Sequence, residues 1–117
     1  MPSAEQLDLT FAALADQTRR AMLARLATGE LSVNELAEPF AMSQPAISKH
    51  LKLLERAGLV TVRREGTRRP RRLAVEPLTA AYAVIERYCE AWESNFKRLD
   101  VLLDDLQQST GDEKEER

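Results

Sequence analysis

A run without proline or glycine, from Leu78 to Gln107, most constrains what this chain of 117 residues can fold into. Its apolar residues recur every three or four positions, at Leu78, Tyr82, Ile85, Cys89, Trp92, Phe96, Leu99, Leu103 and Leu106. This spacing predicts one amphipathic helix over 78–107, about 45 Å long at about 1.5 Å per residue. A domain of this size cannot cover an apolar stripe of that length. Part of the stripe therefore needs a partner.

Shorter helices are predicted at the N-terminal side. Residues 7–15 are apolar-rich, and Asp16 is placed to cap a second helix over 17–27, which Gly29 ends. Ser32, followed three positions later by Glu35, has the pattern of a capping box for a short helix over 33–40.

The segment 43–57 predicts a helix with one buried and one polar face. Ser43 is a candidate N-cap and Pro45 falls in the first turn, where a missing N–H costs nothing. The buried stripe is formed by Ile47, Leu51 and Leu54. The opposite face presents hydrogen-bond donors and cations, at Gln44, Ser48, Lys49 and Lys52.

After Gly58 the apolar period changes from that of a helix to that of a strand. The alternation in 59–65 predicts a strand, and a second short strand is expected near 72–75, so that 59–75 forms a hairpin. This hairpin is rich in arginine, with Arg63, Arg64, Arg68, Arg69, Arg71 and Arg72. The element order predicts a mainly α fold with a small β-hairpin, a winged helix-turn-helix, with the helix of 43–57 shaped for the DNA major groove.

Charge is unevenly distributed along the chain. The net charge is −2, yet the segment from Ser43 to Glu76 has nine Lys or Arg against three Asp or Glu. A polyanion such as DNA can be attracted by such a basic segment on an acidic body, although a solvated charged face would have the same composition. The order of the helix and the hairpin favours DNA.

The stretches ALADQTRRAMLARLATGELSVNELA and SQPAISKHLKLLERAGLV resemble the ArsR-type family of bacterial winged helix-turn-helix repressors. The resemblance covers about Phe11 to Leu106. It implies a homodimer that binds an inverted repeat in promoter DNA and represses transcription. It also implies that the first and last helices form the dimer interface, through Leu7, Phe11, Tyr82, Ile85, Cys89, Trp92, Phe96, Leu99 and Leu103.

The resemblance assigns base reading to Gln44, Pro45, Ser48 and Lys49. Gln44 is suited to adenine and Lys49 to guanine, whereas Pro45 offers only apolar contact. Contacts to the DNA backbone are expected from Arg19, Arg20, Lys52, Arg63, Arg64, Arg68, Arg69 and Arg71.

The regulatory features of the family's metal sensors are missing from the sequence. Ser32 and Asn34 stand where those sensors have thiolates, and the acidic residues of the last helix have no nitrogen or sulfur ligand beside them. We therefore expect no metal and no other cofactor. The single Cys89 is either a small apolar core residue or a redox-sensitive thiol, and His50 is a helix-surface hydrogen-bonding residue or a switch.

Other functional classes fit less well. No phosphate-binding loop or acid–base constellation suggests an enzyme. A protein-interaction module that dimerises through the long helix without specific DNA binding remains the alternative. We expect a single domain over 1–107, a polar disordered tail over 108–117 and no membrane segment. The protein is expected in the cytoplasm. We expect it to regulate its own gene, and any effector to be a small molecule or an oxidant.

Overall fold

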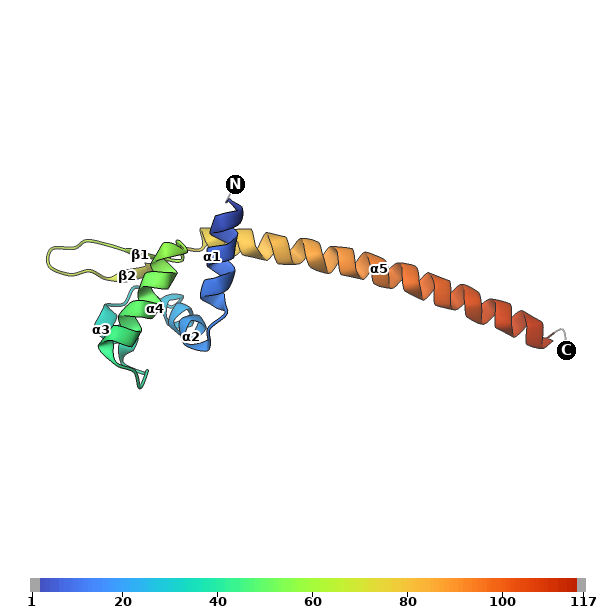
Figure 1. Ribbon diagram of the computed structural model, residues 1–117, viewed down its shortest axis with the longest axis horizontal. Helices are drawn as coiled ribbons and strands as arrows, with labels where there is room; N and C mark the ends of the chain where they lie inside the picture. Colours follow the sequence, from blue (N-terminus) through green and yellow to red (C-terminus); the bar gives the residue numbers. More distant parts are fainter. Residues whose placement is uncertain (1–2, 116–117) are drawn as a thin grey trace. The chain divides into compact units, whose positions relative to one another are not determined.

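The computed structural model describes residues 3–115, and side chains as far as residue 108. The chain forms five helices and two strands in this range: α1 (Ala4–Leu14), α2 (Gln17–Leu26), α3 (Val33–Ala37), α4 (Gln44–Arg56), β1 (Val60–Val62), β2 (Arg71–Leu73) and α5 (Glu76–Glu115). The chain divides into two units, one up to Tyr82 and one from Ala83. The mainly helical fold with a small hairpin confirms the fold class predicted from the sequence (Figure 1).

Local hydrogen bonds explain where the helices of the first unit begin. Asp16 caps α2 and Ser43 caps α4, as predicted, by accepting bonds from Arg19 N and Ala46 N. Ser32 and Glu35 form both bonds of the predicted capping box, each 3.1 Å long. These bonds satisfy amide groups that a helix N-terminus leaves without partners.

The strands β1 and β2 and the loop between them form an antiparallel hairpin, which we call the wing. Val60 lies opposite Leu73 and Val62 opposite Arg71. β2 begins at Arg71 and ends at Leu73, slightly earlier than the 72–75 expected from the sequence. Leu31 pairs with the other edge of β2, exchanging backbone bonds of 3.1 and 2.7 Å with Arg71. The base of the wing is thereby fastened to the segment between α2 and α3.

The core of the first unit lies where α2, α3, α4 and β1 meet. Its largest fully buried side chains include Met22, Leu36, Ile47, Leu54 and Leu59. Ile47, Leu51 and Leu54 are all buried, as the sequence predicts for α4. Burial of this stripe determines which face of α4 remains in solvent.

The second unit is the remainder of α5, from Ala83 on. We expected the helix to end near Gln107, but α5 continues to Glu115. Its residues after 107 combine good helix formers such as Gln108, Glu113 and Lys114 with a poor one, Gly111, and an established helix extends through them because no new nucleation is needed. Residues 116–117, the end of the expected disordered tail 108–117, lie outside the described part of the chain. Within that part, no helix combines the length and the hydropathy that a membrane span requires.

Candidate nucleic-acid interface

The outer face of α4 carries the four residues predicted to read bases. Gln44, Pro45, Ser48 and Lys49 are all exposed, on the side of the helix opposite its buried stripe. Gln44 Nε2 donates to Asn34 Oδ1 on α3 at 3.2 Å, so α3 holds the amide before any ligand binds. The described residues provide no hydrogen-bond partner for the side chains of Ser48 and Lys49, which leaves both free to contact a ligand.

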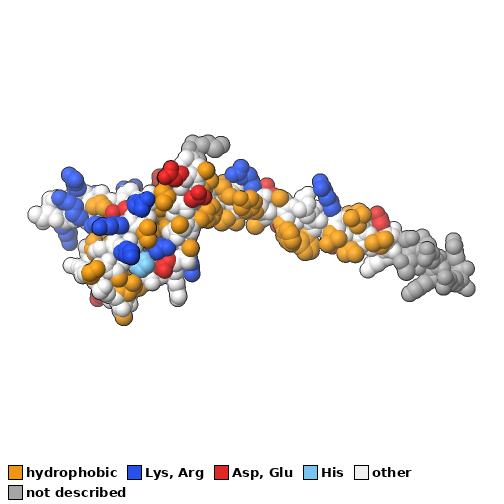
Figure 2. Space-filling view, viewed as in Figure 1, with side chains coloured by type: hydrophobic (Ala, Val, Ile, Leu, Met, Phe, Trp, Pro, Cys, Tyr) orange, Lys and Arg blue, Asp and Glu red, His pale blue; other side chains and the backbone are white. Residues whose placement is uncertain are grey.

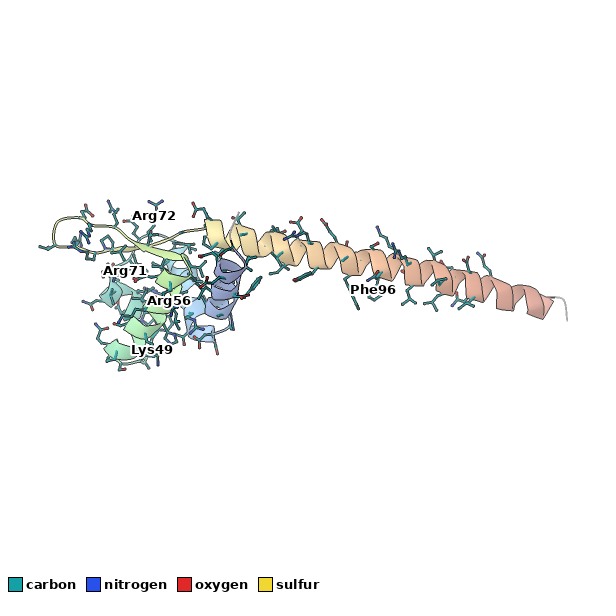
Figure 3. All side chains as sticks on the ribbon, turned by 45° about the horizontal axis from the view of Figure 1, so that its top comes forward. Lys49, Arg56, Arg71, Arg72 and Phe96 are labelled. Atoms are coloured by element: carbon teal, nitrogen blue, oxygen red, sulfur yellow. The ribbon has the colours of Figure 1, made fainter. Side chains whose placement is uncertain are left out.

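Cations continue along α4 to its last turn. Lys52 is exposed, and so is Arg56, which we did not include among the candidate residues. Figure 3 shows Lys49 and Arg56 on α4, with Arg71 and Arg72 on β2. A basic residue in the last turn of a helix is readily explained by the helix dipole, so Arg56 carries no functional signal in the sequence alone.

The arginines of the wing differ in what they contact. Arg64, Arg68 and Arg72 are exposed, and no hydrogen bond or ion pair of their side chains is found among the described residues. Arg69 Nη1 donates to the carbonyls of Gly66 and Arg68, both at 3.0 Å, and so supports the turn. The positive φ of Gly66, 61°, is a conformation that favours glycine at this turn.

Arg63 and Arg71 are held by glutamates. Arg63 donates to Glu30 Oε2 from Nε at 3.1 Å and from Nη2 at 2.8 Å, and Nη2 also reaches Glu65 Oε2 at 3.0 Å. Arg71, half-buried, pairs with Glu55 Oε1 at 3.4 Å. A cavity of about 320 Å³ lies at the Arg63 site, lined by three glutamates and three arginines together with Ser32 and Pro70. Figure 2 shows the basic side chains gathered on the wing and beside it.

The two arginines of α2 that we expected to contact DNA phosphates have partners within the protein. Arg19 donates to the carbonyls of Ala12 and Ala13, each at 2.8 Å. Arg20 donates to the carbonyl of Leu14, also at 2.8 Å. Both guanidinium groups therefore cap the C-terminus of α1, where carbonyl groups lack partners within the helix.

Two carboxyl groups near this surface have altered acidity. The backbone N–H of Arg19 donates to Asp16 and holds the pKa of this carboxyl below its usual value. The bonds from the backbone and side chain of Ser32 similarly lower the pKa of Glu35. Each bond favours the charged form, so both helix caps carry a negative charge at neutral pH.

An apolar face on α5 is exposed within the described chain. Tyr82 is 65% exposed, Ile85 46%, Trp92 64% and Phe96 49%. The rings of Trp92 and Phe96 meet edge to face, with centroids 5.5 Å apart. The remaining residues of the predicted dimer interface behave alike, since Leu99, Leu103, Cys89 and Phe11 are exposed and Leu7 is half-buried.

The positions that hold thiolates in metal sensors have other roles here. Ser32 is the N-cap of α3, and Asn34 accepts the bond from Gln44. Over the described residues, no group of three or more His, Cys, Asp or Glu is placed to hold a metal ion.

Known proteins share this arrangement. Residues 14–63 match a family described as a helix-turn-helix domain. The HTH-type transcriptional regulator Rv2034 of Mycobacterium tuberculosis is 47% identical over 81 residues, 69% of this chain and 76% of that protein. The arsenical resistance operon repressor of Escherichia coli is 35% identical over 107 residues, covering 89% of each chain.

Solved structures agree with these relatives. A crystal structure of an ArsR family transcriptional regulator superposes with a TM-score of 0.73 at 43% identity, over 80% of this chain and 96% of that one. A homodimeric winged helix-turn-helix DNA-binding domain from Mycobacterium bovis has a TM-score of 0.59 at 34% identity, over 74% and 80%. The chain belongs to the ArsR family of winged helix-turn-helix transcriptional regulators, which are DNA-binding proteins and not enzymes.

Proposed function

We propose that this protein is a homodimeric repressor that binds an inverted repeat in promoter DNA, its own promoter included, with α4 in the major groove and the wing on the flanking backbone. The observation that carries the proposal is the exposed outer face of α4, where Gln44, Ser48 and Lys49 point away from a fully buried stripe. Amide and ammonium groups on such a helix can form paired hydrogen bonds with adenine and guanine edges.

The wing supplies the contacts that do not depend on base sequence. Arg64, Arg68 and Arg72 are exposed, and their side chains make no hydrogen bond or ion pair within the described chain, so they can neutralise phosphates without first breaking a bond. A helix for base edges and a hairpin for phosphates together provide positioning and specificity.

A second copy of the chain accounts for the exposed apolar face of α5. The relative from Mycobacterium bovis is a homodimer, and two copies joined along this stripe would bury large side chains such as Trp92 and Phe96. Dimerisation would give two reading helices, which matches the two half-sites of an inverted repeat.

Regulation by a metal is not part of the proposal. Ser32 and Asn34 are engaged in hydrogen bonds that shape α3 and hold Gln44, and neither residue type is a preferred zinc ligand. Control then rests on the abundance of the protein or on a small-molecule or oxidant effector, with Cys89 as the exposed thiol.

Fluorescence anisotropy on the DNA upstream of its own gene, against a scrambled duplex, tests the proposal. Gln44→Ala should weaken binding to the cognate duplex about 5- to 150-fold for each half-site and leave the scrambled duplex unchanged, because a good bidentate base contact is worth about 1–3 kcal/mol. The double variant Arg68→Ala and Arg69→Ala should weaken both duplexes and flatten the salt dependence between about 50 and 200 mM.

A matched control is the double variant Lys97→Ala and Arg98→Ala, which also removes two positive charges, from exposed positions of α5 outside the proposed surface. It should leave both affinities unchanged. Absence of binding to either duplex at low salt would instead favour an interaction module that dimerises without specific DNA binding.

A further inference from the structure

Three polar side chains connect α1 to α4, the helix proposed to read bases: Gln6 on α1, Arg19 on α2 and His50 on α4. None of them belongs to the outer face of α4 that would contact bases. Arg19 reaches His50 on α4, with Nη1 and Nδ1 3.3 Å apart, while its other nitrogens hold the carbonyls of Ala12 and Ala13 at the end of α1. Arg19 therefore connects the C-terminus of one helix with the middle of the other.

The same two helices are joined at a second point, between the start of α1 and the end of α4. Gln6 Nε2, near the start of α1, donates to the carbonyl of Ala57 at the C-cap of α4. Gly58 follows with a φ of 77°, and a Cβ at this position would lie 3.2 Å from Gln6 Nε2. Glycine therefore provides both the left-handed turn and the space that Gln6 occupies.

The hydrogen bonds that link α1 and α4 restrict the position of α4 more closely than apolar packing does. Burial of Ile47, Leu51 and Leu54 is non-directional, so packing alone tolerates small rotations or slides of α4. Hydrogen bonds require a defined distance and angle and so select one position. Base recognition needs side chains within about 0.5 Å of the productive geometry.

The groups around His50 define which of its ring nitrogens faces Arg19. His50 is on α4 with 18% of its side chain exposed, and Asp16 Oδ2 lies 3.8 Å from its Nδ1. A guanidinium group can only donate, so Nδ1 accepts and the neutral ring carries its proton on Nε2. Asp16 is itself held by the backbone N–H of Arg19 at 3.0 Å.

We infer that Arg19 and His50 are positioning residues, which fix the reading helix α4 against α1, and that Arg19 does not contact DNA phosphates. The inference rests on the proposed function. In a dimer joined partly through α1, the same pair would also set the separation of the two reading helices. The specificity of DNA recognition would then depend on residues that touch no DNA.

The first test is nitrogen-15 NMR of the free protein at about pH 8, above the ordinary pKa of histidine. His50 is the only histidine in the chain, so its ring signals need no assignment. We expect the Nε2–H tautomer, and a shift of the Nδ1 signal in Arg19→Lys, because lysine cannot reproduce the guanidinium fork. The Nδ1–H tautomer, or signals unchanged by Arg19→Lys, would overturn the inference.

The second test measures DNA binding by the same variants. His50→Ala and Arg19→Lys should lower the preference for cognate over scrambled DNA about three- to tenfold, the equivalent of a hydrogen bond, with unchanged affinity for the scrambled duplex. His50→Gln, whose amide oxygen can accept from Arg19, should retain part of the preference. Arg98→Lys is the control, since it makes the same substitution at an exposed position of α5 outside the proposed DNA surface.

Arg19→Ala separates positioning from phosphate contact. A positioning role leaves the slope of log affinity against log salt unchanged, whereas loss of a phosphate contact flattens it by about 0.9 per protomer. A flattened slope, or full cognate preference in His50→Ala with an unchanged thermal melt, would overturn the inference. Wild-type protein without cognate preference would instead refute the proposed function, and NMR would still decide whether the Arg19–His50 bond exists.

Discussion

The glutamates beside Arg63 are expected to restrain DNA binding by the wing, and Glu30→Gln tests this directly. Arg63 makes three charged bonds, two to Glu30 and one to Glu65. A phosphate that binds Arg63 must therefore displace a carboxylate. Replacing Glu30 by glutamine removes the charge that holds two of these bonds and keeps the shape of the side chain.

The size of the effect follows from the exposure of the pair. The side chains of Arg63 and Glu30 are 49% and 31% exposed, so solvent and salt screen their attraction. Such a pair is worth about 0–1 kcal/mol, so its loss should tighten DNA binding at most about fivefold for each wing. Each newly neutralised phosphate should also steepen the salt slope by about 0.9.

Anisotropy titrations of wild type, Glu30→Gln, Arg63→Ala and the double variant, with cognate and scrambled duplexes, measure this coupling. Glu30→Gln should tighten both duplexes equally, because a phosphate contact does not read bases. In the Arg63→Ala background, the gain should vanish. An equal gain in that background would show that a carboxylate near DNA simply repels it, and absence of any gain would refute the restraint itself.

Three further outcomes are expected. Phe96→Asp should shift the protein from dimer towards monomer in sedimentation equilibrium, whereas Ser94→Asp, on another face of α5, should not; a dimer unaffected by Phe96→Asp would contradict the proposed interface. Leu54→Ala should lower the free energy of unfolding by about 2–5 kcal/mol in urea titrations, since Leu54 is fully buried; a loss below about 1 kcal/mol would place Leu54 outside the core. The pKa of Glu35 is lower in the folded than in the unfolded protein, so ionised Glu35 stabilises the fold above its unfolded pKa, and this stabilisation is lost as pH falls through the folded pKa. The melting temperature of Glu35→Gln should therefore decline less than that of wild type between about pH 5 and pH 3. Equal declines would refute this.

The sequence predicted the starts of α2, α3 and α4 well because they depend on neighbours within the chain, whereas the first helix was expected over 7–15 and instead begins at Ala4, capped by Ser3. Asp16, Ser32 and Ser43 each accept a bond from an amide three residues on, and such bonds require no tertiary contact. The buried stripe of α4 was also predictable, since its period fixes one apolar face. The pairing of Leu31 with β2 was not, because a single bridging residue has no period to detect.

The roles of the arginines could not be read from the sequence for a related reason. Arg19 and Arg63 differ from Arg68 only in what folding brings near them. Arg19 bonds helix-end carbonyls and Arg63 pairs with a glutamate that is distant in the sequence, whereas Arg68 has no hydrogen bond or ion pair within the described chain and only the weaker attraction of Glu35. Composition counts each as one positive charge available to DNA. Their donors are nevertheless committed to different degrees before DNA arrives.

This difference limits what the basic segment can contribute to DNA binding. The segment from Ser43 to Glu76 holds nine cations, and glutamates pair with two of them, Arg63 and Arg71. If every cation neutralised one phosphate, the salt slope would reach about 8 per protomer; without these two it cannot exceed about 6. If cations outside the segment make no phosphate contact, a wild-type slope above that limit would mean that DNA separates Arg63, Arg71 or both from their glutamates on binding. If Arg63 is separated, its carboxylates act only on the free protein, and Glu30→Gln would tighten binding without steepening the slope.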